Sequence, residues 1–173
     1  MDLTPRTLRT GAKTGLSVDS LLAAALMAEI LSPSRELWLV SPWITDVRVI
    51  DNRHGSFDAL FGDTPPHAWR LSDALLRAAG AGSDVYVVAR PDSHNEPFLR
   101  RLEAARLDDT LHVRRDADVH EKTLCGQEWL LTGSMNYTVR GMSRNDEAII
   151  YKVGGPDAGQ ARLDLAQRWR SGS

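Results

Sequence analysis

Segments with helical and strand patterns alternate along most of this chain, and this alternation restricts the fold more than any other feature. The run LLAAALMAEIL at residues 21–31 favours a helix that ends at Ser32-Pro33, and residues 36–44 have the composition of a buried central strand. Further helices are expected at 68–79, 95–106 and 157–170, and further strands at 85–89, 111–113 and 148–151. The pattern predicts an α/β fold: a mixed, largely parallel sheet sandwiched between helices.

The length and composition fit one folded unit. A domain of 173 residues buries roughly 70% of the surface that its unfolded chain exposes. The sequence contains no internal repeat, no low-complexity tract and no stretch with the composition of a linker. We therefore expect a single domain over residues 1–173.

Five polar residues in the second half suit phosphodiester chemistry. His120 and Lys122 are two residues apart, so on a strand their imidazole and ammonium groups would project to the same face. Ser134 and Asn136 repeat this spacing and add a hydroxyl and an amide that can donate to phosphate oxygens. Glu147 supplies a carboxylate able to hold one ring nitrogen of a histidine. The sequence therefore predicts a catalytic site that needs no metal ligands and no cofactor.

This constellation resembles the HKD motif of the phospholipase D superfamily, whose pattern is H-x-K, four residues, D, six residues, G-[SG]-x-N and a later acidic residue. The matching positions are His120, Lys122, Gly133, Ser134, Asn136 and Glu147. Gln127 stands where the family has its aspartate, and the interval from there to Gly133 is one residue short. We interpret the difference as a hairpin whose loop, at Gly126-Gln127, has lost a residue together with the aspartate. In the family that aspartate serves structure more than phosphate contact.

The resemblance implies a mechanism and an assembly. Only one copy of the motif is present, and family members with a single motif build the site at a two-fold axis, so a homodimer is implied. One His120 would attack phosphorus and form a phosphohistidine, while the His120 of the other subunit protonates the departing oxygen. Lys122 and Asn136 would stabilise negative charge on the phosphoryl oxygens, with no divalent ion.

Substrate contacts are expected at four positions. Ser134 lies within the motif, and Arg144 belongs to a basic group beyond it. Ser41 and Trp43 follow the first central strand, and in the superfamily the loop leaving that strand often borders the active site. The simpler interpretation of this loop is that Ser41 forms a turn and Trp43 lies in the core. Asp46, in the same loop, is a further substrate-contact position under the first interpretation.

The motif does not name the substrate. A small single-motif chain most resembles the bacterial nuclease branch, so nucleic acid, DNA or RNA, is the first hypothesis. Phospholipid hydrolysis or head-group transfer is the second, and the third is a partner-dependent nucleic-acid-binding subunit of a bacterial assembly such as a phage-defence system. A net charge of −2 and a pI near 6.2 provide no general basic field. Two interpretations of the arginines near the motif are open: they form a local basic groove, or they are ordinary solvated charges. These arginines are Arg114, Arg115, Arg140 and Arg144.

The remaining sequence features concern the cellular compartment of the protein and the segment at residues 45–67. Cys125 is the only cysteine, no stretch reaches membrane-spanning length and no secretion signal is apparent, which favours a cytoplasmic protein without a membrane partner. Residues 45–67 lose regular periodicity and are expected to form a long irregular connection, such as a lid or specificity loop over a dimer cleft. A metal cluster of His54, His67, Asp51 and Asp63 is disfavoured because its spacing matches no ligand motif.

Overall fold

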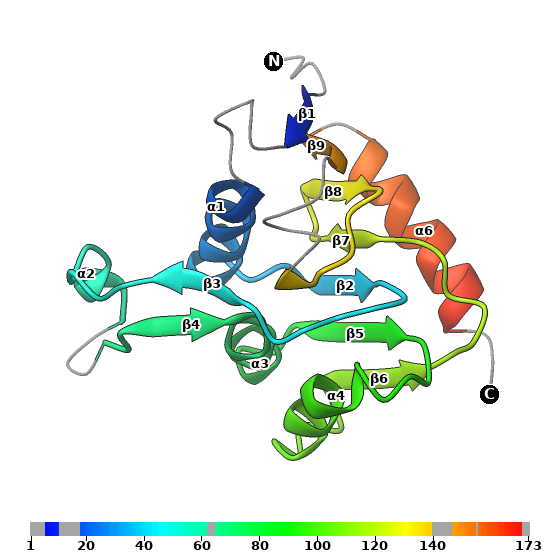
Figure 1. Ribbon diagram of the computed structural model, residues 1–173, viewed down its shortest axis with the longest axis horizontal. Helices are drawn as coiled ribbons and strands as arrows, with labels where there is room; N and C mark the ends of the chain where they lie inside the picture. Colours follow the sequence, from blue (N-terminus) through cyan, green and yellow to red (C-terminus); the bar gives the residue numbers. More distant parts are fainter. Residues whose placement is uncertain (1–5, 11–17, 62–64, 140–146, 155, 171–173) are drawn as a thin grey trace.

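The computed structural model of the chain describes residues 6–10, 18–61, 65–139, 147–154 and 156–170. Its centre is a seven-stranded sheet in the order β1-β9-β8-β7-β2-β5-β6 (Figure 1). The strands of this sheet are β1 (Arg6–Thr10), β2 (Glu36–Val40), β5 (Asp84–Ala89), β6 (Leu111–Arg115), β7 (Thr123–Cys125), β8 (Trp129–Gly133) and β9 (Glu147–Val153). The main helices are α1 (Val18–Leu31), α3 (Leu71–Gly80), α4 (Glu96–Glu103) and α6 (Asp157–Trp169).

The sheet is mixed, as expected, and its parallel part lies at one side. β2 pairs with β5 and β5 with β6 in parallel, while β7, β8, β9 and β1 join antiparallel. Fewer of the strand pairs in this sheet are parallel than the expectation of a largely parallel sheet implied. The cause is the short connection between β7 and β8, since only antiparallel strands can be joined by a tight hairpin.

Alternate residues of the central strands face two separate cores, so the sheet lies between two helical layers. In β2, Leu37 and Leu39 pack into the cluster formed with α1, α3 and α4, whereas Trp38 and Val40 pack into the cluster formed with α6. Figure 1 shows α6 running along the β7–β9 side of the sheet. Most of β2 is inaccessible to solvent, and this explains its continuous apolar sequence.

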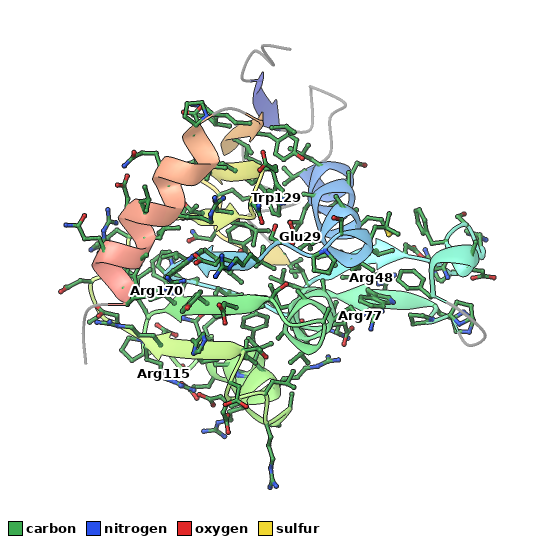
Figure 2. All side chains as sticks on the ribbon, turned by 180° about the vertical axis from the view of Figure 1, so that it is seen from behind. Glu29, Arg48, Arg77, Arg115, Trp129 and Arg170 are labelled. Carbon is green, nitrogen blue, oxygen red and sulfur yellow. The ribbon has the colours of Figure 1, made fainter. Side chains whose placement is uncertain are left out.

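Aromatic residues link the three parallel strands on the α6 face. Trp38 of β2 lies opposite Tyr86 of β5, and Tyr86 lies opposite His112 of β6. The rings stack with centroid separations of 4.1 Å and 4.6 Å. Arg170, labelled in Figure 2, places its guanidinium 4.4 Å from the Tyr86 ring centroid and forms an ion pair with Glu36 at 2.9 Å. These contacts fix the end of α6 against β2 and β5.

The segment expected to be an irregular connection contains regular structure. β3 (Arg48–Asp51) pairs antiparallel with β4 (Ala68–Arg70), and α2 (Asp58–Phe61) lies between them. In Figure 1 these elements project from one side of the main sheet. The expected helix at 68–79 was wrong at its start, because α3 begins at Leu71. Pairing with β3 and stacking of Trp69 on Phe61 at 4.7 Å stabilise the strand there.

The other predicted elements are confirmed with shifted ends. α1 begins three residues before the predicted start, and β9 and β6 extend beyond the predicted strands. α4 is shorter than expected, and Asn95, at the start of the predicted helix, makes no side-chain cap hydrogen bond. Its buried amide is engaged elsewhere, as described below.

Candidate active site

The motif residues meet at one end of the β7–β8 hairpin. Thr123, the first residue of β7, lies opposite Thr132, and their hydroxyl oxygens are 3.1 Å apart. His120 and Lys122 therefore precede β7 at the same end of the sheet at which Ser134 and Asn136 follow β8. The expectation that His120 and Lys122 lie on a strand was wrong, because β7 starts only at Thr123. The hairpin itself, with its turn at Gly126-Gln127, is confirmed.

His120 is exposed, and two cationic side chains contact it. Lys122 Nζ donates to the main-chain oxygen of His120 at 3.0 Å. Nη2 of Arg90 lies 2.7 Å from Nδ1 of the imidazole. Arg90 directly follows β5, and the sequence analysis missed it. The available signal was its place at the carboxyl end of a central parallel strand, where ligands of open α/β sheets commonly bind.

Asn136 is held against the loop that leaves β2. Thr45 N donates to the main-chain oxygen of Tyr137 at 2.8 Å, and Ile44 and Tyr137 form an isolated parallel bridge. The Oδ1 atom of Asn136 is buried and has no hydrogen-bond partner among the described residues. A groove of about 670 Å³ lies beside it, lined by Trp43, Thr45, His94, Asn136, Thr138 and Val139. Asn136 itself is partly exposed beside this groove, so its amide can reach a polar ligand there.

The two proposed contact residues in the loop after β2 differ in their exposure to solvent. Trp43 is 38% exposed and borders the groove, so it is placed to touch a substrate. Ser41 is fully buried, and its hydroxyl donates to the main-chain oxygen of Trp43 at 3.0 Å. Ser41 therefore shapes the loop and presents no hydroxyl to the groove, in agreement with the simpler interpretation.

Asp46, in the same loop, serves α3. Its carboxylate accepts hydrogen bonds from the backbone N–H and the hydroxyl of Ser72, at 3.0 Å and 2.9 Å, and pairs with Arg101 at 2.9 Å. These bonds satisfy donors at the start of the helix. Asp46 is thus a structural residue, contrary to its proposed substrate contact.

Asn95 joins the loop after β2 to the end of β5. Its Oδ1 accepts from the Ile44 N–H at 2.8 Å, while Nδ2 donates to the main-chain oxygens of Pro42 and Arg90 at 2.8 Å and 2.9 Å. The amide is fully buried, so these three bonds replace its hydration. Asn95 therefore fixes Trp43 and Arg90, which lie on different segments, beside the same site.

The remaining predicted site residues are placed as follows. Ser134 is exposed immediately after β8. Glu147 is the first residue of β9, but its side chain, like the whole of Arg144 and Arg140, lies outside the described residues. The contact between Glu147 and His120 therefore stays a prediction.

A buried carboxylate organises the turn between β7 and β8. Glu29 of α1 accepts hydrogen bonds from the backbone N–H of Ser34 at 2.9 Å, from its hydroxyl at 2.6 Å and from Nε1 of Trp129 at 2.6 Å. Figure 2 shows Glu29 and Trp129 meeting between α1 and β8. A Cβ on Gly126 would lie 2.5 Å from Glu29 Oε1 and 2.8 Å from Ser34 Oγ, so only glycine fits.

Gln127, at the position of the missing aspartate, belongs to the same network. Its N–H donates to Ser34 Oγ at 2.7 Å, and its Oε1 accepts from the Arg35 N–H at 3.3 Å. Arg162 of α6 donates to the Gly126 main-chain oxygen at 2.7 Å. Side chains from α1, α6 and the segment before β2 thus fix the shortened turn.

Arg114 and Arg115 do not form a basic groove. Arg115, labelled in Figure 2, pairs with Glu96 at 2.9 Å and Glu103 at 2.6 Å, and the hydrogen bonds that it donates to Glu103 and Glu96 raise the pKa of its guanidinium. Arg114 donates to Asp116 at 3.0 Å and to the Trp169 main-chain oxygen at 2.8 Å. Their charges stabilise the packing of α4 and α6 on β6 and are largely neutralised there.

The described residues provide neither a metal cluster nor a reactive cysteine. Within the described ranges, no three His, Cys, Asp or Glu side chains gather as metal ligands, and Asp63 of the disfavoured cluster lies outside those ranges. Cys125 is buried, and burial raises the pKa of its thiol to about 12, so it is a core residue. No helix in the described part of the chain has the length and apolar character needed to cross a bilayer.

Comparison with known proteins identifies the family. The family described as "Cardiolipin synthase, PLD-like domain" matches residues 59–169. Among solved structures, Nuc from Salmonella typhimurium, a phospholipase D family member, is 17% identical with a TM-score of 0.63, covering 98% of this chain and 97% of that one. The archaeal chromatin protein TrmBL2, which binds DNA, is 12% identical with a TM-score of 0.55, covering 96% and 52%.

Phosphatidylserine synthase from Haemophilus influenzae is 14% identical with a TM-score of 0.56, covering 96% of this chain and 38% of that one. No curated protein matches the sequence. At these identities the structural likeness shows the fold alone, and it agrees with the mixed sheet between helices. The family match spans more than half of the sequence and includes the complete motif segment, so the chain belongs to the phospholipase D-like family.

Proposed function

We propose that this protein is a metal-independent phosphodiesterase that cleaves the nucleic-acid backbone through a phosphohistidine on His120, in an active site shared by two copies of the chain. The observation that supports this most is the placement of His120, Lys122 and Asn136 at one end of the β7–β8 hairpin, with His120 exposed. Membership of a superfamily of phosphodiesterases supplies the reaction class.

The chemistry requires two histidines in different protonation states. A ring nitrogen of one His120 attacks phosphorus, a P–N bond forms, and the P–O bond to the leaving group breaks. The His120 of the second subunit gives its proton to the departing oxygen. It then takes a proton from water, whose oxygen displaces the histidine and completes hydrolysis. The sequence of one chain contains one motif histidine, so a dimer would supply the pair.

Lys122 and Asn136 would stabilise the charge that develops on the phosphoryl oxygens. The ammonium of Lys122 is tethered to the His120 main-chain oxygen and has two further N–H groups. The Asn136 amide borders the groove, and its Nδ2 group can donate to a phosphoryl oxygen. Removing one donor of this kind typically lowers the rate by about 10²–10³.

Nucleic acid is favoured over lipid because the most apolar helix is used in the core. Leu22 and Leu26 of α1 are completely buried against the sheet, so this helix does not present its apolar side to a bilayer. The DNA-binding activity stated for TrmBL2 is consistent with a nucleic-acid substrate on this fold.

A phospholipid substrate is the second candidate. Trp43 and Val139 are exposed in the groove beside Asn136, at 38% and 58%, and could accommodate an acyl chain or head-group region as well as a nucleobase. Phosphatidylserine synthase shows that the same fold occurs in a lipid enzyme. A partner-dependent subunit that binds nucleic acid without cutting it is the third candidate.

The test is cleavage of single- and double-stranded DNA and RNA in excess EDTA by the wild type and by His120→Ala. We expect cleavage that survives the chelator and is lost in the variant. Absence of cleavage by both proteins would contradict the nuclease proposal. Release of a head group from phosphatidylcholine would then favour the lipid enzyme, and tight nucleic-acid binding without cleavage would favour the partner-dependent subunit.

A further inference from the structure

Arg90 occupies an unusual position at the candidate active site. Its Nε donates to the Val119 main-chain oxygen at 2.8 Å, and its Nη2 lies 2.7 Å from His120 Nδ1 and 3.3 Å from His120 Nε2. The guanidinium carbon lies 5.1 Å from the centroid of the Trp43 ring. Three segments of the chain, after β5, before β7 and after β2, therefore hold this one cation.

Arg90 has no carboxylate partner within the described residues. Arg101, Arg114, Arg115, Arg168 and Arg170 each form an ion pair there. The Nη1 group of Arg90 makes no hydrogen bond in the same part of the structure, although the residue is only partly exposed. A partly buried guanidinium that is oriented by neutral groups is available for an anionic ligand.

The guanidinium of Arg90 lies against the imidazole of His120. Its Nη2 atom is 2.7 Å from one ring nitrogen and 3.3 Å from the other, so the contact is with the ring as a whole. Arg90 therefore stands beside the nitrogens with which His120 would attack phosphorus.

We propose that Arg90 is a phosphate-binding residue of this site and that it exchanges its hydrogen bond to His120 for one to the substrate's phosphoryl group. Movement of the guanidinium to the phosphoryl group uncovers the His120 ring for attack. Binding of the anion and access to the nucleophile are thereby coupled. This inference rests on the proposed function only in taking the anion to be the phosphate of a phosphodiester.

Inorganic phosphate binding, followed by titration calorimetry and by ¹⁵N NMR of the His120 ring, tests the proposal without requiring turnover. The ring signals are identified by their loss in His120→Ala. We expect the ring signals to change when phosphate is added. Arg90→Gln should weaken phosphate binding by about 10- to 100-fold and leave the ring signals insensitive to phosphate. Arg90→Lys, which keeps the charge, should restore part of the affinity.

Arg100→Gln is the matched control, because Arg100 pairs only with Glu96 on the exposed side of α4, with 78% of its side chain accessible. Its phosphate affinity should equal that of the wild type. Thermal unfolding of each variant shows whether a loss of affinity is caused by misfolding. If Arg90→Gln is misfolded, the phosphate affinity of Arg90→Lys is compared with that of the wild type instead. Equal phosphate affinity in wild type and Arg90→Gln would overturn the proposal.

Cleavage of bis(p-nitrophenyl) phosphate in the same samples separates this inference from the proposed function. If the wild type binds phosphate through Arg90 but cleaves no phosphodiester, the proposed function fails while the role of Arg90 is supported. If the wild type cleaves the compound and Arg90→Gln binds phosphate equally well, the proposed function stands and this inference is overturned.

Discussion

At the scale of the residue, two cationic side chains contact His120. Arg90 lies against its imidazole, whereas Lys122 donates to its main-chain oxygen, and Arg90 is also held by the Val119 carbonyl. Carbonyl groups orient a cation without neutralising it. Both charges therefore stay available to a phosphate, unlike those of the arginines engaged in ion pairs elsewhere in the described structure.

Replacement of Lys122 should impair catalysis more than folding. Lys122→Ala is expected to reduce kcat by about 10²–10³, because it removes a donor to the phosphoryl oxygens, while Lys122→Arg should keep part of the rate. The control is Lys152→Ala, which removes only a pair with Asp157 at 2.9 Å. Steady-state kinetics with chemical denaturation checks this, and a Lys122→Ala enzyme with wild-type kcat would contradict the role.

Cys125 gives a pH-dependent prediction. Burial raises the pKa of its thiol from an ordinary value near 9 to about 12 in the folded chain. Between these values the unfolded chain loses the proton and the folded chain keeps it, so stability falls as pH rises above about 9. In Cys125→Ala the free energy of unfolding should fall less steeply there, by at most about 1.4 kcal/mol per pH unit. Identical slopes for both proteins in urea titrations would disprove the assignment.

Some residues of the candidate site could be predicted from the sequence and others could not. The motif residues His120, Lys122 and Asn136 could be found because their identity and spacing are local properties. Arg90 could be recognised as a residue at a strand end, but its contact with His120 could not be predicted. The two are separated by a helix and a strand, and only the order of strands in the sheet brings them together. Ser41 was proposed as a contact from its position, but position in a loop does not determine whether a hydroxyl faces the core.

At the scale of the element, the β7–β8 hairpin depends on a turn without space for a side chain. Glu29, Ser34 and Trp129 surround Gly126 so closely that a methyl group would overlap them. The shortened turn also brings Gln127 within reach of Ser34 and Arg35. The network compensates for the missing aspartate by contacts from outside the hairpin.

Gly126→Ala should therefore destabilise the fold by about 1–3 kcal/mol, since the buried network must move. Gly80→Ala is the matched control. Gly80 ends α3, and a Cβ there meets no atom within 4 Å, so its effect should be neutral or slightly stabilising. Urea unfolding of both variants checks this, and equal stability of the two would show that the turn tolerates a side chain.

The elements also show which sequence signals were overridden. Residues 68–70 read as the first turn of an amphipathic helix, but they pair with β3 and extend the chain into β4. A partner strand that lies about twenty residues earlier is invisible to local periodicity. The buried strands β2 and β5 were predicted correctly because continuous apolar runs have few alternatives in an α/β chain.

At the scale of the whole molecule, the sheet joins a parallel half to an antiparallel half. Alternating helices and strands predicted the first half, and the motif hairpin produces the second. The order of the strands and the pairing of β1 with β9 depend on contacts distant in sequence, so the pattern alone could not provide them. The site lies near the boundary between the halves, where β7 adjoins β2.

A shared active site predicts a specific response to mixing subunits. If each site needs His120 from both chains, activity after exchange of wild type with His120→Ala should follow the square of the wild-type fraction. An equal mixture would then retain about a quarter of the activity. The measurement is turnover of re-equilibrated mixtures, with dimerisation checked by light scattering. Activity in direct proportion to the wild-type fraction, or an active monomer, would contradict the shared site.

The most direct test of the central claim is to trap the covalent intermediate. An end-labelled oligonucleotide is mixed with the enzyme in EDTA, quenched with alkali within the first turnover, and the adduct is located by mass spectrometry of the digested protein. We predict a phosphoramidate on His120 that is stable to alkali, labile to acid and absent from His120→Ala. Cleavage without any adduct, or an adduct on another residue, would show that His120 is not the nucleophile.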